Sequence, residues 1–237
     1  MTDISVVPID RLELSFSSWK WPFAEKRRQD IDTHFAALRE KTPELWNGRV
    51  LLLRDFAIAD GTFRGSCFET DFASFLAWRD WEFPDAAVKN CFAMGALRGS
   101  DGAFVLGEMT PHTANAGKIY FPAGTPDPDD IRGSTVDLTG SVMREVLEET
   151  GLTPDDFVAE PGWITVLAGP YIAQMNILQA HDDSAILQRR ILDYLAQETQ
   201  PELAGIHIAQ GPADLDPRMP PFVTAFLSYM WREGPER

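Results

Sequence analysis

The sequence predicts a mixed α/β sandwich, and three observations favour this fold class. Short apolar stretches bounded by turn residues occur both before and after one charged helical segment at 138–150. Further helical segments follow the strands without alternating strictly with them, which argues against regular βαβ repeats. The 237 residues, 44% of them hydrophobic, suffice to bury a large core. Together these features indicate a mixed sheet covered by helices. We therefore predict an α/β protein of the α+β type.

Residues 1–89 are predicted to form an N-terminal α+β extension. Residues 11–16 alternate polar and apolar as a half-buried strand does, and a polar-faced helix at 24–41 ends before Thr42-Pro43. Turn pairs at Asn47-Gly48 and Asp60-Gly61 frame a hairpin, and a short helix follows at 71–81. This part of the chain contains the tryptophans Trp19, Trp21, Trp46, Trp78 and Trp81. They could stack on a ring of the substrate, or they could pack in a core or at a dimer face, and both interpretations stay open.

Residues 90–237 are predicted to form the second and larger unit. Its expected elements, in chain order, are strands at 91–98, 103–110 and 118–124, the helix at 138–150, a hairpin of 163–169 with 171–180, a helix at 183–198, a strand at 205–209 and a helix at 220–232. The boundary near residue 90 is placed by Pro84 and the polar Lys89-Asn90 step.

Charge and cysteine content exclude several classes of function. The formal charge is -15, from 36 acidic against 21 basic residues, and nucleic-acid binding needs the opposite balance. No signal peptide or apolar run of membrane-spanning length is visible, so we expect a soluble, cytoplasmic protein with neither nucleic acid nor a membrane as partner. Cys67 and Cys91 have no metal-ligand spacing, and we expect two reduced, buried thiols.

The segment 138–150 combines good helix ends with an unusual polar face. Asp137 is a suitable N-cap and Gly151 a suitable C-terminal stop. At about 100° per residue, we expect one apolar stripe and one charged arc: Val142, Met143, Val146, Leu147 and Thr150 form the first, and Arg144, Glu145, Glu148 and Glu149 the second.

Three glutamates close together near a helix C-terminus repel one another and oppose the helix macrodipole. A solvated surface tolerates this crowding, which is one interpretation. A hard divalent cation removes it, because Mg²⁺ is held by carboxylate oxygens together with waters and substrate phosphates. The second interpretation is therefore a metal site.

The order of residues from Arg144 to Leu152, REVLEETGL, resembles the second half of the Nudix box, and KIYFPAG at 118–124 resembles the strand and turn that lead into it. The resemblance implies an α/β/α sandwich and an Mg²⁺- or Mn²⁺-dependent hydrolase that cleaves the diphosphate bond of a nucleoside diphosphate linked to another group. It also implies roles for single residues. Glu145 and Glu149 would bind the metal directly, Glu148 directly or through water, Arg144 would hold the carboxylates by ion pairing, and Gly124 would open the box.

Two departures from the usual box stand out. The usual box has its first glycine fourteen residues before the arginine, whereas Gly124 precedes Arg144 by twenty, so we expect a six-residue insertion in the PDPDDIRGST region. The usual box also has a glutamate eight residues before that arginine, where this chain has Val136. The adjacent Asp137 either supplies a carboxylate from a shifted register or is only the helix cap, and we expect the cap. Since the three core glutamates remain, we expect catalysis, and the alternative is a catalytically silent nucleotide-binding or regulatory module.

The substrate and the remaining site residues follow less directly. Nucleotide sugars, coenzyme A and ADP-ribose stay open as substrates, since faint resemblances point to the coenzyme A and the UDP-sugar groups of the family. Arg98, Lys118 and Arg132 are candidates for phosphate contacts because they lie near the box in sequence. Candidates for a general base outside the box are Glu160, Asp182 and Asp183. A homodimer is also left open.

Overall fold

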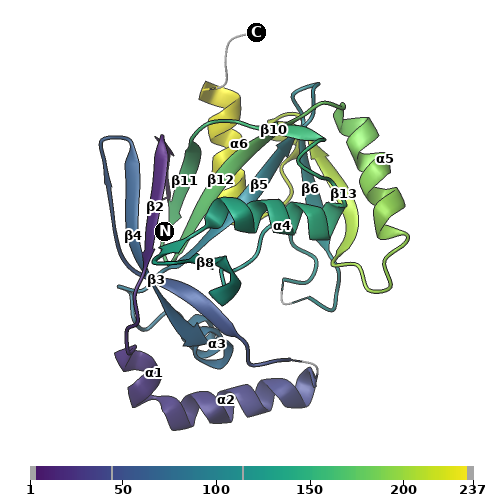
Figure 1. Ribbon diagram of the computed structural model, residues 1–237. Coiled ribbons are helices and arrows are strands. Elements are labelled where there is room, and N and C mark those ends of the chain that lie inside the picture. The colour runs from purple at the N-terminus through teal and green to yellow at the C-terminus, as the bar shows by residue number, and fades with distance from the viewer. Residues whose placement is uncertain (1–3, 44, 114, 234–237) are drawn as a thin grey trace.

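The computed structural model describes residues 4–43, 45–113 and 115–233, and these form two sheets with helices around them (Figure 1). The elements are β1 (Ile4–Ile9), β2 (Arg11–Phe16), α1 (Pro22–Lys26), α2 (Arg28–Lys41), β3 (Arg49–Ala59), β4 (Thr62–Asp71), α3 (Phe72–Asp80), β5 (Asn90–Arg98), β6 (Phe104–Met109), β7 (Ile119–Tyr120), the 3₁₀ turn η1 (Pro128–Asp130), β8 (Ile131–Arg132), β9 (Thr135–Val136), α4 (Leu138–Thr150), β10 (Phe157–Ala159), β11 (Trp163–Ala168), β12 (Tyr171–Ala180), α5 (Ser184–Leu195), β13 (Leu203–Ala209), η2 (Pro212–Asp214) and α6 (Pro221–Glu233).

The larger sheet is mixed and lies between helices. Its strands follow the order β1-β11-β12-β5-β6-β13, with β10 beside β12 and β7 beside β6, and only the β12–β5 pair is parallel among these neighbours. Alternate residues of β5 point to opposite faces. Gly95 meets Val146 of α4, whereas Phe92 packs on Phe222 of α6 with ring centroids 5.3 Å apart. The predicted mixed α/β/α sandwich is therefore confirmed.

The smaller sheet has the order β3-β4-β2-β9-β8 and carries α2 and α3 on one side. Ile31 of α2, Phe68 of β4 and Trp78 of α3 are fully buried between them. The predicted hairpin of β3 and β4 is present, and so are the predicted helices. Of the tryptophans in this part, Trp19, Trp21, Trp78 and Trp81 belong to or pack against this second core, whereas Trp46 is 80% exposed.

The two parts of the chain exchange strands. β1 pairs antiparallel with β11 at the edge of the larger sheet, although it belongs to the first 89 residues. In the other direction, β9 pairs with β2 in the smaller sheet. The division at residues 89 and 90 stays a prediction, but the pairing shows that neither sheet is completed by one side of that boundary alone.

Both cysteines are buried and free, as predicted. Among the described helices, none is both long and apolar enough to cross a membrane.

Candidate active site

Helix α4 has the ends that the sequence predicts. The Asp137 carboxylate accepts a hydrogen bond from the Gly140 backbone N–H at 2.9 Å, so Asp137 is the N-cap. Gly151 ends the helix with a φ of 70°, a left-handed conformation that glycine adopts without strain, and donates to the Leu147 carbonyl at 2.8 Å. The buried residues Val142 and Val146 face the sheet at Gly95.

The predicted charged arc is wrong at one position. Glu149 is only 4% exposed, and Leu147, placed on the apolar stripe, is 46% exposed. Glu149 follows Val142 by seven residues, which at about 100° per residue brings it to within about 20° of that buried valine. Glu149 therefore points inward, and the helix places a carboxylate under the loop that precedes it.

The buried Glu149 carboxylate is held by the loop after β7. Its Oε1 accepts a hydrogen bond from the Ala123 backbone N–H at 3.1 Å. Burial raises the pKa of Glu149 well above its usual value, the Ala123 hydrogen bond opposes this, and the charges of Glu145 and Glu202 raise the pKa further. The FPAG turn thus contacts α4 directly.

Glu145 is packed between the same loop and Arg144. Its Oε1 lies 3.5 Å from the Arg144 Nη2, and a Cβ atom added to Gly124 would overlap the Glu145 carboxylate. Burial raises the pKa of Glu145 to about 7, which Arg144 opposes and Glu148 reinforces. A side chain at position 124 would therefore displace the Glu145 carboxylate from its present place.

Glu148 lies on the solvent side of the helix. It is exposed, and in the described part of the chain no hydrogen bond or ion pair engages its carboxylate. Its backbone carbonyl accepts from the Tyr194 hydroxyl of α5 at 3.2 Å, which ties this end of α4 to its neighbour. The carboxylate is thus free to turn toward a ligand.

The inserted residues form a small hairpin. Ile131 pairs with Val136 and Arg132 with Thr135, so β8 and β9 run out and back around Gly133. Val136 is buried in the core and carries no carboxylate toward α4. The carboxylate that does reach Arg144 is that of Asp130, whose Oδ1 accepts from the Arg144 Nη1 at 2.8 Å. The sequence analysis did not nominate Asp130.

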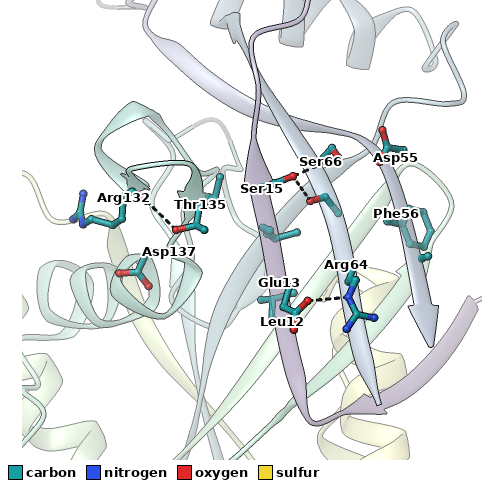
Figure 2. A pocket seen from close by; sticks show the side chains of 14 residues that line it. Leu12, Glu13, Ser15, Asp55, Phe56, Arg64, Ser66, Arg132, Thr135 and Asp137 are labelled. Carbon is teal, nitrogen blue, oxygen red and sulfur yellow. Dashed lines mark hydrogen bonds and ion pairs between the residues drawn. The ribbon is translucent and has the colours of Figure 1, made fainter. Parts of the chain in front are cut away.

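The hairpin also forms one wall of a pocket on the smaller sheet (Figure 2). This pocket has a volume of about 790 Å³ and is lined by residues of β2, β3, β4 and the hairpin. Figure 2 shows Arg132 extending away from β2 and β4, and its Nη1 donates to the Asp129 carbonyl at 2.6 Å. Neither Gly124 nor any of the three glutamates lines this pocket, so it is separate from the carboxylate cluster.

The other predicted phosphate contacts lie apart from the cluster or next to its loop. Arg98 places its guanidinium over the Phe104 ring at 5.9 Å, and Phe104 in turn packs on Phe226 of α6. This is the face of the sheet opposite α4, so we no longer assign Arg98 to the site. Lys118 is exposed immediately before β7, the strand that leads into the Gly124 loop.

Two of the three base candidates outside the box have structural partners instead. Asp182 pairs with Arg190 at 2.7 Å, Asp183 caps α5 through the Ile186 N–H at 2.8 Å, and Glu160 lies in the connection between β10 and β11. Sequence reasoning missed Glu202, which directly precedes β13 and is exposed. Its negative charge contributes to the raised pKa of both Glu145 and Glu149, so Glu202 lies near the cluster.

The donor set suits a hard cation, although the side chains do not surround one. In residues 4–43, 45–113 and 115–233, no three histidine, cysteine, aspartate or glutamate side chains are arranged to hold a metal ion. Glu149 is turned to Ala123 and Glu145 to Arg144 and Gly124. The atoms available are nevertheless all carboxylate oxygens, the ligands that Mg²⁺ and Mn²⁺ prefer. The chemistry of the residues therefore fits such an ion.

Comparison with known proteins finds similarity only at the level of structure. No family model matches the chain, and no curated protein does. Three solved structures are similar. A Nudix hydrolase from M. smegmatis, RenU, has 15% identity and a TM-score of 0.39, and the match covers 62% of this chain and 87% of that chain. The MutT protein from Methanosarcina mazei Go1 has 19% identity and a TM-score of 0.39, with 62% of this chain and 96% of that chain covered, and the E. coli ORF135 protein has 15% identity and a TM-score of 0.36, with 63% and 96% covered in the same order. These likenesses are too distant to transfer a substrate or a mechanism.

Proposed function

We propose that this protein is a Nudix-type hydrolase that cleaves the diphosphate bond of a nucleoside diphosphate derivative, with Mg²⁺ or Mn²⁺ held by Glu145, Glu148 and Glu149. The observation that carries the proposal is the burial of Glu149 against the Ala123 N–H, with Glu145 packed on Gly124 beside it. A merely solvated acidic face would leave these carboxylates in water, because burying an uncompensated charge is costly. Their inward placement supports a cation-binding role.

In the proposed site, each residue has a role that follows from its position. Glu149 and Glu145 are held on one end of α4 by the loop at Ala123 and Gly124, and Glu148 supplies a third carboxylate from the exposed side. A divalent cation, when bound, offsets the charge of the diphosphate and favours ionisation of a bound water. Arg144 lies beside Glu145 and keeps it oriented, and Glu202, whose charge acts on both Glu145 and Glu149, is the proposed acceptor of the proton from the attacking water.

Hydrolysis at this site forms a bond from water oxygen to one phosphorus and breaks the bridging phosphorus–oxygen bond. Each product keeps one phosphate. The second group of the substrate is a sugar, a coenzyme A-type group or an ADP-ribose-type group. Lys118, exposed beside β7, is the proposed cationic contact for the substrate phosphates, together with the Gly124 loop.

The proposal is tested by a substrate screen. Wild-type protein is incubated with nucleotide sugars, ADP-ribose, dinucleoside polyphosphates, NADH and coenzyme A, with Mg²⁺, Mn²⁺ or EDTA, and phosphate-bearing products are detected with a coupled phosphatase. Glu148→Gln removes a carboxylate of the cluster, and Glu198→Gln, an exposed glutamate beyond α5, is the matched control. We expect turnover only with the metal, reduced by Glu148→Gln and unchanged by the control.

The second candidate is a catalytically silent nucleotide-binding module. One observation favours it: in the described residues, no three carboxylates are arranged around a position where a metal ion could bind. The same screen separates the two functions. Binding of a nucleotide without product release, in the presence of either metal, would replace the hydrolase proposal with the silent module.

A further inference from the structure

Asp130 carries a buried carboxylate directly before the inserted hairpin 131–136. It ends the 3₁₀ turn η1 and is 1% exposed, while its neighbour Asp129 is exposed. Aspartate is rarely buried to this degree unless its charge is paired and hydrogen-bonded. The position therefore has partners that account for its burial.

Both oxygens of Asp130 are engaged, and by two different elements. Oδ1 accepts from the Arg144 Nη1 at 2.8 Å. Oδ2 accepts from the Asp127 backbone N–H at 3.1 Å and from the Ser141 hydroxyl at 3.3 Å. One carboxylate thus connects the loop that follows Gly124 to the middle of α4, one residue before Glu145.

The hairpin explains how Asp130 reaches this place. The Asp137 N–H donates to the Asp130 carbonyl at 2.9 Å. The hairpin therefore begins after Asp130, and its end brings Asp137 back beside Asp130. The six residues 131–136 between them are β8, β9 and their turn. Without these six residues, Asp130 would precede Arg144 by eight positions and Gly124 would precede it by fourteen, which is the spacing of the usual Nudix box.

The hairpin has its own contacts away from α4. Thr135 pairs with Ser15 of β2, and the Phe16 N–H donates to the Ser134 carbonyl at 2.8 Å. The inserted residues thus extend the smaller sheet, while Asp130 stays with the box helix.

We infer that Asp130 is a positioning residue that orients Arg144, and through it Glu145, for cation binding, and that the hairpin 131–136 interrupts an otherwise complete box without taking part in the chemistry. This inference rests on the proposed function. Asp130 replaces the carboxylate that is absent at Val136, and Asp137 remains a helix cap only.

The test measures Mn²⁺ affinity by titration with detection of free Mn²⁺ by electron paramagnetic resonance. Asp130→Asn is compared with wild type and with Asp129→Asn, the exposed neighbour. We expect Asp130→Asn to weaken Mn²⁺ binding about 10- to 100-fold, as is usual when a partner of a metal ligand is lost, and Asp129→Asn to bind as wild type. Wild-type affinity in folded Asp130→Asn would overturn the inference and leave the proposed function standing, whereas wild type without Mn²⁺ binding would overturn both.

A double-substitution cycle separates positioning from a general structural role. If Asp130 acts through Arg144, Asp130→Asn combined with Arg144→Gln binds Mn²⁺ no more weakly than Arg144→Gln alone. Independent, additive losses would show that Asp130 acts by another route and would overturn the inference. If Asp130→Asn does not fold, Arg144→Gln removes the same contact from the helix side, and unchanged Mn²⁺ affinity in that variant would equally overturn it.

Discussion

Two aspartate–arginine pairs, one in each part of the molecule, share a hydrogen bond of the same length but have different surroundings. Asp71 accepts from the Arg28 Nη1 at 2.8 Å, and Asp130 accepts from the Arg144 Nη1 at 2.8 Å. Asp71 also caps α3 through the Ser74 N–H at 2.9 Å, so its carboxylate joins α2 to α3. Arg144, by contrast, lies 3.5 Å from a Glu145 carboxylate oxygen.

The difference shows that the role of an ion pair depends on which residues its two members contact next. The Asp71 pair joins two helices to the core that contains Trp78, and its loss should reduce stability. The Asp130 pair leads to the glutamates of α4, and its loss should reduce cation binding. Changes around α4 are therefore expected to alter activity, and changes around α3 to alter stability.

Glu202→Gln gives the largest effect among the variants that sharpen this comparison. Removing its charge lowers the negative charge that acts on Glu145 and Glu149, and the proposed proton acceptor is lost as well. We expect kcat to fall by about 10²-fold or more, the range for loss of a general base. Steady-state kinetics at saturating Mg²⁺ measures this, with unfolding in urea as the check on stability. An unchanged kcat would remove Glu202 from the site.

Asp71→Asn is expected to act on stability and not on kcat. Asparagine can still cap α3, so the variant loses mainly the charged hydrogen bond with Arg28, on the order of 1–3 kcal/mol of unfolding free energy. Urea unfolding at pH 7 measures the loss. A fall in kcat with unchanged stability would contradict the division between the two regions.

The same pair has a defined pH dependence. Burial raises the pKa of Asp71, but the hydrogen bonds from Arg28 and Ser74 outweigh this and leave the pKa below its usual value. The pair therefore stabilises the protein fully above the usual aspartate pKa of about 3.9, and the stabilisation is lost as the pH falls through the lower, folded-state pKa. The stability difference between wild type and Asp71→Asn should shrink over that acid range. A difference that grows on acidification would show that the pKa is raised.

Trp46→Ala is expected to have the smallest effect on stability and activity. It tests directly whether the first part of the chain has a role in substrate binding. Trp46 is 80% exposed in the connection between α2 and β3, so its removal should leave stability unchanged. If it stacks on a substrate ring, KM rises about fivefold, the low end of the energy for base stacking on an aromatic residue. Trp46→Phe should restore most of the affinity. An unchanged KM would assign the first part of the chain a structural role only.

Local signals predicted most of the fold. Asp137 and Gly151 mark the two ends of α4, because a cap and a left-handed glycine act within one helical turn. The strand β1 was not predicted, since its pairing depends on β11, which lies far along the chain. Its Pro8 is compatible with the edge position that the strand occupies.

The glutamates and the arginine of the candidate site could be nominated from the sequence, but their arrangement could not. The residues Arg144, Glu145 and Glu149 follow from their order alone, whereas the burial of Glu149 depends on the loop at Ala123. Asp130 was missed because the hairpin shifts it six positions in sequence while leaving it beside Arg144 in space. Glu202 comes from a distant connection, and no local pattern marks it.

The most direct test of the metal-dependent hydrolase is the kcat of Glu149→Gln with the substrate that the screen identifies, measured across a range of Mn²⁺ concentrations. Glutamine keeps the shape of the side chain and can still accept from the Ala123 N–H, so the helix should remain folded. We predict a loss of roughly 10²- to 10³-fold, the usual consequence of removing one preorganised electrostatic contact. Turnover at the wild-type rate, with the same dependence on Mn²⁺, would show that α4 is not where the reaction occurs.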